Sequence, residues 1–275
     1  MEAVAGAGCT IEETDILGDG AADLIVQHAD PAAIQRAAAE ALQYAPIDLC
    51  AQALEHRRKR LLVADMDSTI IGCECLDELA DFAGVKTQVA AITERAMRGE
   101  VDFEAALRER VAMLKGLKLA DVARCYDERV RLNPGARTLV RTMAANGARC
   151  VLVSGGFDVF TRRVAEAAGF HADQANRLVE ADGALAGLVA EPILGREAKL
   201  KALIDEAAAA GIPLADTLAV GDGANDLDMI GAAGLGVAYR AKPVVAAQAR
   251  ARIDHADLTA LLYFQGYSAD MFVTD

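Results

Sequence analysis

Short runs of apolar residues recur along the chain after residue 60, each followed by small or acidic residues. The runs are Leu61–Ala64, Cys150–Val153, Thr217–Val220 and Leu235–Tyr239. Apolar stretches of this length are typical of parallel strands that are buried on both faces. Helical segments separate the runs, so the pattern predicts βαβ units and an α/β fold built on a doubly wound parallel sheet.

Three of these runs are followed by short segments of polar residues and glycines, namely Asp65–Thr69, Ser154–Gly156 and Gly221–Asp226. In doubly wound sheets the ligand binds in a crevice outside the carboxyl ends of the strands. We therefore expect the three clusters to meet at one edge of the sheet, although they are far apart in the sequence.

Between residues 77 and 132 the strand pattern gives way to helical spacing, as in Phe103–Leu107. Such a long helical stretch exceeds a simple crossover between two strands. We predict an inserted helical cap over 77–132, above a Rossmann-like core formed by 57–76 and 133–275. Asp182-Gly183 lies between partly alternating arms and predicts a short β-hairpin.

Residues 1–56 are predicted to form a separate N-terminal segment. A strand is expected at Asp23–Gln27, followed by a helix over Ala32–Leu42 that Pro31 opens. The basic cluster Arg57–Arg60, which leads into the first apolar run, is interpreted as a solvated linker.

Composition narrows the class of protein. Hydrophobic residues make up 53% of the 275, which is enough for a substantial core. No apolar run approaches the roughly 18 residues that span a membrane, and the N-terminus lacks a secretory pattern, so we expect a cytoplasmic protein without a membrane partner.

The net charge of −13 makes nucleic acid a poor partner. The six cysteines are scattered and are expected to be free thiols.

Clustered carboxylates are the main candidate chemistry. Asp65 and Asp67 lie two residues apart at a strand end, where side chains two apart share a face. Asp222 and Asp226 follow another strand in a glycine-rich loop. One interpretation is that these aspartates only form turns. The other is that a cation neutralises them, and oxygen ligands of this kind favour Mg²⁺.

A phosphate beside such a cation needs hydrogen-bond donors. Ser154 offers a hydroxyl, and Gly155 allows a close approach of the backbone. Lys199, within the predicted helix Glu197–Leu203, offers positive charge. Taken alone, a lysine in such a helix is more often solvated.

These motifs resemble those of the haloacid dehalogenase superfamily of phosphatases, whose D-x-D-x-T signature matches Asp65–Thr69. Ser154–Gly156, Lys199 and Gly221–Asp226 resemble the three remaining motifs, in the expected order. The resemblance covers about residues 57–266 and extends in detail to the phosphoserine phosphatases of that superfamily.

The resemblance implies a two-step mechanism. Asp65 attacks phosphorus and becomes an aspartyl-phosphate, while Asp67 protonates the leaving oxygen and later activates water. Asp67 must therefore hold a proton near neutral pH. The resemblance also implies that Mg²⁺ is held by Asp65, the carbonyl of Asp67 and Asp222, with Thr69 and Asp226 supporting the site.

Substrate specificity is expected in the cap. By resemblance, Glu74 binds the amine of the substrate and Arg110 its carboxylate, which a guanidinium holds at two points. From the residues alone, Glu74 also suits a helix-start acid, and Arg110 an intrahelical pair with a neighbouring glutamate. Met97 and Phe103 resemble residues that close over the substrate, and packing within the cap is the alternative for both. The other substrate-binding residues implied are Ser154, Gly155, Lys199 and Asn225.

The resemblance thus implies Mg²⁺-dependent hydrolysis of a small phosphomonoester, O-phospho-L-serine, as the last step of serine biosynthesis. Two alternatives stay open: a related phosphatase or phosphotransferase acting on phosphohomoserine, phosphothreonine or pyridoxal phosphate, and a non-catalytic ligand-sensing protein. The presence of both Glu74 and Arg110 favours an amino-acid substrate, and the presence of both Asp65 and Asp67 favours catalysis. Many relatives carry a ferredoxin-like regulatory module, of which residues 1–56 are interpreted as a remnant. The oligomeric state stays open, with a homodimer as one option.

Overall fold

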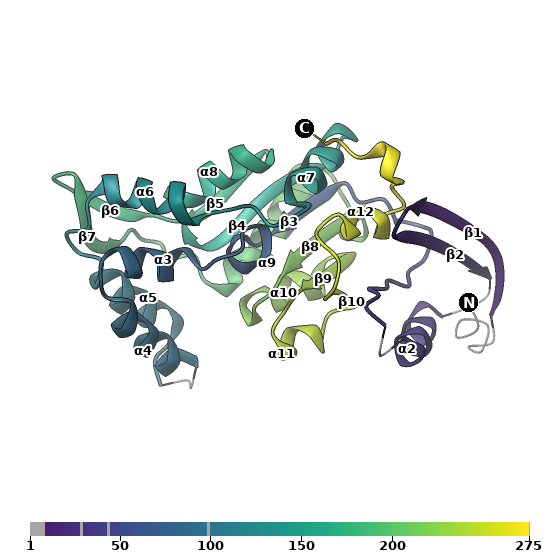
Figure 1. Ribbon diagram of the computed structural model, residues 1–275, viewed down its shortest axis with the longest axis horizontal. Coiled ribbons are helices and arrows are strands. Elements are labelled where there is room, and N and C mark those ends of the chain that lie inside the picture. Colours follow the sequence, from purple (N-terminus) through teal and green to yellow (C-terminus); the bar gives the residue numbers. More distant parts are fainter. Residues whose placement is uncertain (1–8, 28–29, 43–44, 98–99, 275) are drawn as a thin grey trace.

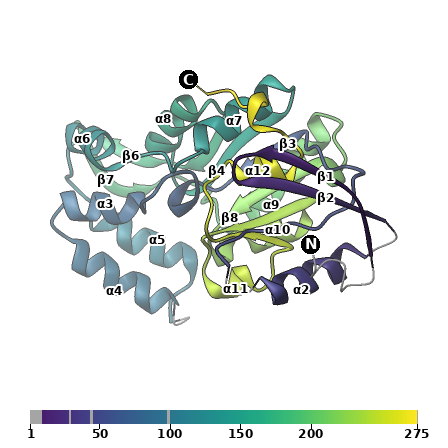
Figure 2. The same cartoon turned by 45° about the vertical axis from the view of Figure 1, so that its right-hand side comes forward.

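The structure is a computed structural model that describes residues 9–27, 30–42, 45–97 and 100–274. Over these residues a parallel sheet with flanking helices forms the centre of the molecule. A layer of helices and a short hairpin lies at one end, and an N-terminal hairpin with one helix lies at the other (Figure 1 and Figure 2).

The central sheet contains six parallel strands among the described residues, in the order β10-β9-β8-β3-β4-β5. Their bounds are β3 (Leu61–Ala64), β4 (Arg149–Phe157), β5 (Ala172–Asn176), β8 (Thr217–Gly221), β9 (Leu235–Tyr239) and β10 (Ala251–Ile253). The four predicted strands are confirmed, and so is the α/β fold. The two edge strands β5 and β10 were not predicted, because one is largely polar and the other has only three residues.

Helices cover both faces of the sheet, as a doubly wound fold requires. Leu62 and Ala64 of β3 point into one hydrophobic core, and Leu61 and Val63 point into the other, because side chains alternate along a strand. The first core is closed by α7 (Ala136–Ala145), α8 (Asp158–Ala168) and α12 (Ala260–Phe264), and the second by α9 (Arg196–Ala209), α10 (Leu227–Ala232) and α11 (Pro243–Ala246).

The predicted helical insertion follows β3 and lies at one end of the sheet (Figure 1). It contains α3 (Cys75–Phe82), α4 (Lys86–Met97), α5 (Phe103–Ala112) and α6 (Leu119–Arg129). The predicted hairpin, β6 (Leu178–Ala181) and β7 (Ala184–Val189), joins the same layer, because Gly116 N donates to Leu185 O at 2.8 Å. Its turn residues Asp182 and Gly183 both have positive φ, as an Asp-Gly turn requires. The division into cap and core stays a prediction.

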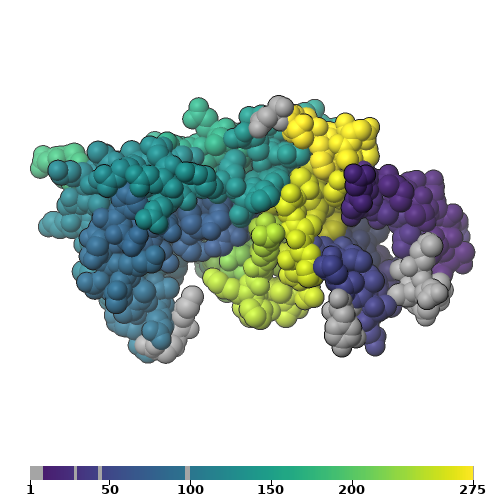
Figure 3. Space-filling view, viewed as in Figure 1, coloured from purple at the N-terminus to yellow at the C-terminus, as the bar shows by residue number. Residues whose placement is uncertain are grey.

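The N-terminal unit consists of the hairpin β1 (Thr10–Gly18) and β2 (Ala21–Gln27), followed by α2 (Pro31–Ala41). Asp30 caps the helix by accepting a hydrogen bond from Ala32 N at 3.1 Å. The predicted strand and the predicted helix start at Pro31 are therefore confirmed. In Figure 3 this unit borders the C-terminal segment, at the end of the molecule away from the cap. Its interpretation as a ferredoxin-like remnant stays a prediction.

The basic cluster before β3 is only partly solvated: Arg58 and Arg60 are exposed, but the prediction was wrong for Arg57 and Lys59. Lys59 is 4% exposed, and its ammonium donates to the carbonyls of His56 and Ala215 at 2.7 Å each. Arg57 forms an ion pair with Asp23 of β2 at 2.7 Å. The cations find these partners because the segment crosses the surface of the core and docks the N-terminal unit on it.

All six cysteines are free, as the sequence predicts. Among the helices in the described ranges, none is both long and apolar enough to cross a membrane.

Candidate active site

Three carboxylates converge at the carboxyl ends of two neighbouring strands. Asp65 follows β3 and Asp222 follows β8, and Asp226 ends the helical turn η3 (Ala224–Asp226) in the same loop. One oxygen from each carboxylate lies within 4.8 Å of the others, and all three residues are buried. The sheet therefore brings together the aspartates that the sequence places about 160 residues apart.

Lys199 of α9 supplies positive charge to this cluster. It is 2% exposed, and its Nζ lies 2.6 Å from Asp65 Oδ1 and 2.5 Å from Asp226 Oδ1. Burial acts to lower the pKa of Lys199, but the two carboxylates outweigh it and raise the pKa, so the ammonium stays charged. The interpretation of Lys199 as a solvated helix lysine is therefore wrong.

One ammonium does not balance three carboxylates. Burial raises the pKa of Asp65 well above its usual range, and the charge of Asp226 adds to this effect against the opposing effect of Lys199. Burial also raises the pKa of Asp222, to about 6. A second cation at this position would favour the ionised form of both carboxylates.

The donor set suits a hard cation. Asp226 already uses both of its oxygens, since Oδ1 contacts Lys199 and Oδ2 accepts from Gly223 N at 2.9 Å. Gly221 has to be glycine here, because a Cβ at this position would lie 2.4 Å from Cγ of Asp226. Asp226 thus supports the loop, and Asp65 and Asp222 are the carboxylates that can face a cation such as Mg²⁺.

The carboxylate of Asp67 has hydrogen-bond partners outside this group. Its Oδ1 accepts from Cys75 N at 2.8 Å, and its Oδ2 accepts from Ser154 Oγ at 3.2 Å. Burial, followed by the nearby charge of Glu74, raises the pKa of Asp67 to about 6. Asp67 therefore holds a proton more readily than an exposed aspartate, as an acid near neutral pH must.

The end of β4 brings a hydroxyl and two glycines to the site. Ser154 is 2% exposed, and its Oγ accepts from Gly156 N at 2.8 Å. A Cβ on Gly156 would lie 3.0 Å from both Asp67 Oδ2 and Ser154 Oγ. Larger residues would therefore push this loop away from Asp67.

The helical insertion reaches the end of β4 through Phe103, the first residue of α5. Its Cζ lies 3.6 Å from the position that a Cβ on Gly155 would take. A Cβ on Gly195, just before α9, would lie 3.7 Å from the same ring. Phe103 thus lies over two loops of the core.

Arg110 and Glu74 lie nearby and are held in place. The half-buried guanidinium of Arg110 donates to Ala106 O at 3.2 Å and Thr93 Oγ1 at 3.5 Å. Burial lowers the pKa of Arg110, while the charges of Asp77 and Glu74 oppose the decrease. No glutamate in the described ranges forms an ion pair with Arg110, so the alternative of an intrahelical pair is wrong.

Glu74 precedes α3 and is exposed. Its Oε1 accepts from Ser68 Oγ at 2.7 Å, and Ser68 itself has a φ of 56° in the turn after Asp65. A positive φ costs free energy in a residue other than glycine, so this turn is held by its surroundings.

Three other predicted residues contribute less to the observed geometry. Asn225 is exposed, and its amide lies beside the backbone of Gly223. Thr69 is buried, and its Oγ1 has no hydrogen-bond partner among the described residues. Met97 ends α4, and its side chain lies outside the described residues.

Comparison with known proteins identifies the class. The family profile of haloacid dehalogenase-like hydrolases matches residues 62–231. The chain belongs to the haloacid dehalogenase-like hydrolase family. This assignment agrees with the arrangement of the four motifs around the ends of β3, β4 and β8.

Curated relatives and a solved structure show which proteins of this family the chain resembles. A phosphoserine phosphatase of Streptomyces coelicolor is 46% identical over 224 residues, 82% of this chain and 54% of that one, so the chain spans about half of that relative. A phosphoserine phosphatase of a Polaromonas species is 48% identical over 208 residues, 74% of this chain and 88% of that one. The structure of a phospho-aspartyl intermediate analogue of phosphoserine phosphatase has a TM-score of 0.70 and 39% identity, covering 75% of this chain and 99% of that one.

Within this family framework, the sequence interpretation missed Asn176 at the end of β5. Asn176 is 2% exposed, and its Nδ2 donates to Gly155 O at 2.9 Å and to Leu194 O at 3.2 Å. Its Oδ1 accepts from Leu194 N at 2.7 Å. One amide therefore joins the loop after Ser154 to the segment before α9. A single asparagine in a polar stretch gives no sequence signal for this role.

Lys242 was also missed. Its Nζ lies 4.0 Å from Asp222 Oδ2, and its backbone N–H donates to Asp222 O at 3.1 Å. The charge of Lys242 therefore opposes the effect of burial on the pKa of Asp222.

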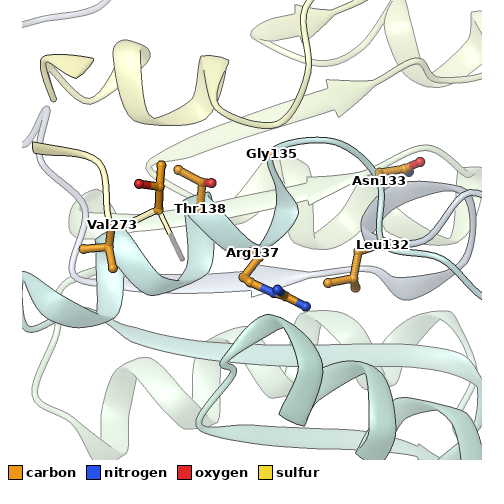
Figure 4. Close-up of a pocket in the computed structure, with 7 residues that line it drawn as sticks. Leu132, Asn133, Gly135, Arg137, Thr138 and Val273 are labelled. Carbon is orange, nitrogen blue, oxygen red and sulfur yellow. The ribbon is translucent and has the colours of Figure 1, made fainter. Parts of the chain in front are cut away.

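Two cavities lie away from the carboxylates. The smaller, of about 280 Å³, lies between the start of α7 and the C-terminal segment, and Figure 4 shows Val273 and Thr138 at one side of it and Leu132 and Asn133 at the other. The larger, of about 1350 Å³, lies under the N-terminal unit and is lined in part by β2 and α12. Asp65, Asp222 and Lys199 line neither cavity.

Proposed function

We propose that the chain hydrolyses O-phospho-L-serine to L-serine and phosphate, with Mg²⁺, as the last step of serine biosynthesis. The observation that carries the proposal is the buried contact of Lys199 with Asp65, beside Asp222. Arg110 lies close enough to Glu74 for the charge of Glu74 to act on its pKa. The names of the relatives support the same substrate.

Asp65 is the nucleophile in this proposal. Its carboxylate attacks phosphorus, so that an aspartyl oxygen–phosphorus bond forms while the bond to the serine oxygen breaks. Lys199 at 2.6 Å keeps the carboxylate in position and offsets charge on the phosphoryl oxygens, together with Ser154 and nearby backbone N–H groups.

Asp67 is the acid and then the base. In its protonated form it delivers a proton to the departing serine oxygen, and in its ionised form it takes one from the water that cleaves the aspartyl-phosphate. A pKa of about 6 suits both roles near neutral pH. The hydrogen bonds from Cys75 N and Ser154 Oγ hold its side chain for this transfer.

Asp65, Asp222 and the carbonyl of Asp67 would hold Mg²⁺, and Asn225 and Asp226 would support their loop. When bound, the ion would neutralise the clustered carboxylates and polarise the phosphate oxygens. Thr69 belongs to the same turn as Asp67, and its unpaired Oγ1 is available to that turn or to the phosphate.

The cap residues supply specificity in the proposal. Arg110 would bind the carboxylate of the substrate, since a half-buried guanidinium without a carboxylate partner in the described ranges lacks a counter-ion. Glu74 would bind the ammonium group, with Ser68 orienting its carboxylate. Phe103 would close over the bound serine, beside Gly155. The role expected for Met97 stays a prediction.

The test measures phosphate release with Mg²⁺ from L-phosphoserine, D-phosphoserine, phosphothreonine, phosphohomoserine and pyridoxal phosphate. Wild type is compared with Asp65→Asn and with a matched control, Asp205→Asn, on the exposed side of α9. We expect L-phosphoserine to be preferred, and Asp65→Asn to lose at least about a thousandfold in kcat while the control keeps wild-type turnover.

Other results of this test would contradict the proposal in part or in whole. Preference for another phosphate ester would contradict the roles of Glu74 and Arg110 but leave Asp65 as the nucleophile. No release of phosphate from any of these esters would favour the ligand-sensing alternative. Full turnover in Asp65→Asn would exclude the proposed mechanism.

A further inference from the structure

Two thiols lie on the segment that leads from the site turn into α3. Cys73 is half-buried and Cys75 is 0% exposed, and both are free. They are two residues apart in a segment that is extended at Glu74, so their side chains leave the same face of the chain. The Sγ of Cys73 also contacts Arg129 O at 3.9 Å. A thiol that solvent reaches therefore lies two residues from one that it does not reach.

Glu74 and Cys75, on the same segment, also contact residues of the proposed site. The N–H of Cys75 donates to Asp67 Oδ1 at 2.8 Å, and Glu74, between the thiols, accepts from Ser68 Oγ at 2.7 Å. A covalent change at Cys73 and Cys75 therefore acts on Asp67 and Glu74 through a single peptide segment.

We propose that Cys73 and Cys75 form a site of reversible oxidation, whose disulfide withdraws Glu74 and the Cys75 amide from the active site. The effect on turnover rests on the proposed function, whereas formation of the disulfide does not. The oxidant is a peroxide, and the reductant that restores the site is a dithiol.

The reaction balances in two steps. The sulfur of Cys73 attacks one oxygen of hydrogen peroxide, the O–O bond breaks, and a sulfenic acid and water form. The sulfur of Cys75 then attacks the Cys73 sulfur, the S–O bond breaks, and the hydroxide leaves as water with the thiol proton. Two electrons pass from the thiols to the peroxide, and a dithiol returns them.

Backbone geometry explains why the disulfide would alter the site. Glu74 is extended, with φ −97° and ψ 107°. Residues two apart in an extended chain have Cα atoms about 6.6 Å apart. Disulfides usually hold these atoms about 4.4–6.8 Å apart, and most often about 5.5–6 Å apart. Relaxation of the disulfide toward its most common spacing therefore bends the chain at Glu74, which moves its carboxylate and changes the direction of the Cys75 N–H.

The experiment treats the metal-loaded protein with hydrogen peroxide, quenches it with an alkylating agent, and maps the disulfide by peptide mass spectrometry. Turnover of L-phosphoserine is measured before treatment, after it, and after incubation with dithiothreitol. Cys73→Ser is the test variant, and Cys50→Ser, another partly buried cysteine from the N-terminal segment, is the matched control.

In wild type and Cys50→Ser we expect a peptide 2 Da lighter that links Cys73 to Cys75, with kcat/KM at least about tenfold lower and restored by dithiothreitol. Cys73→Ser should keep its turnover after the same treatment. The proposal is overturned by a link from Cys73 to Cys125, by sulfinic acid in place of the disulfide, or by equal inactivation of Cys73→Ser. If the disulfide forms but turnover is unchanged, the proposed effect of the disulfide on the active site is excluded. If untreated wild type releases no phosphate, the proposed function fails, and the peptide map still decides whether the disulfide forms.

Discussion

At the scale of single residues, Lys199 has the largest consequence. It is buried between Asp65 and Asp226, with which it forms an ion pair and a charge-assisted hydrogen bond respectively. Removing one member of such a group leaves the others charged without a partner. The resulting loss of folding free energy exceeds the net contribution of the intact pair. The same lysine thus stabilises the fold and prepares the proposed nucleophile.

Lys199→Met should lower the free energy of unfolding by about 3–5 kcal/mol at pH 7.5 in the absence of Mg²⁺, because two buried carboxylates lose their counter-ion. Lys201→Met, two residues along α9, removes only an exposed pair with Asp205 and should cost less than about 1 kcal/mol. Urea unfolding of both variants measures the difference. Equal losses would show that the buried ammonium contributes no more than a surface one.

The raised pKa of Asp222 makes cation binding depend on pH. In the metal-free protein this pKa is about 6, above its usual value, so the contribution of Asp222 to stability is present at low pH and lost as the pH rises through about 6. Below pH 6 a proton must leave before the cation binds. We expect the apparent Kd for Mg²⁺ to rise by up to about tenfold per pH unit from pH 6 to pH 5, and to be nearly constant from 7 to 8.

Titration calorimetry of metal-free protein at these pH values measures this dependence without reference to turnover. Asp222→Asn should lose most of the affinity at every pH. An affinity that is the same at pH 5 and pH 7 would contradict the assignment of Asp222 as a ligand.

At the scale of elements, the site depends on how loops from different strands are joined. Asn176 connects the end of β5 to Gly155 near the end of β4 and to Leu194 before α9, and all of its amide atoms are used. Ser154 adjoins Gly155 in β4, and Lys199 lies near the start of α9. A residue that touches no substrate therefore sets the distance between two groups that do in the proposed mechanism.

Asn176→Ala leaves three partly buried backbone groups without their partner and should destabilise the protein by about 2–3 kcal/mol. It should also lower kcat/KM for L-phosphoserine, with a larger change in kcat than in KM, because Ser154 and Lys199 lose their relative position. Asn146→Ala, which removes a similar hydrogen bond at the end of α7, is the control and should leave kcat unchanged. Equal effects on kcat in the two variants would reduce Asn176 to a purely structural role.

At the scale of the whole molecule, the cap and the N-terminal unit lie at opposite ends of the sheet (Figure 1). The N-terminal unit is held to the core by polar contacts at a distance from the carboxylate cluster. Asp48 accepts from the backbone of Asp254 at 2.7 Å, of His255 at 3.1 Å and of Ala256 at 2.7 Å. Its docking is therefore expected to change independently of the proposed chemistry.

Asp48→Ala should increase the rate at which trypsin cleaves at Arg57 and Arg58, since the segment before them loses three hydrogen bonds to the core. Turnover of L-phosphoserine should stay within about twofold of wild type. Asp15→Ala, on the exposed face of β1, is the control and should leave the cleavage rate unchanged. A fall in turnover of about tenfold or more in Asp48→Ala would show that the N-terminal unit is coupled to the site.

Much of the fold was predictable because its signals are local. The apolar runs of β3, β4, β8 and β9, the helical spacing of the cap and the Asp-Gly turn each depend on neighbouring residues. The polar clusters could be placed at one edge because parallel strands end on the same side. By contrast, the polar edge strand β5 and the three-residue β10 lack such a pattern, and only pairing with the sheet forms them.

The sequence by itself therefore determined the order of the elements and the residue types at the ends of the strands. Only the tertiary structure decided which cations are buried and what they contact. Lys199 and Asp226 are 27 residues apart, Lys59 and Ala215 are 156 apart, and such contacts leave no periodic trace in the chain. The physical reason is that burial and charge pairing depend on segments that approach only after the sheet has formed, whereas periodicity depends on backbone geometry that each segment carries alone.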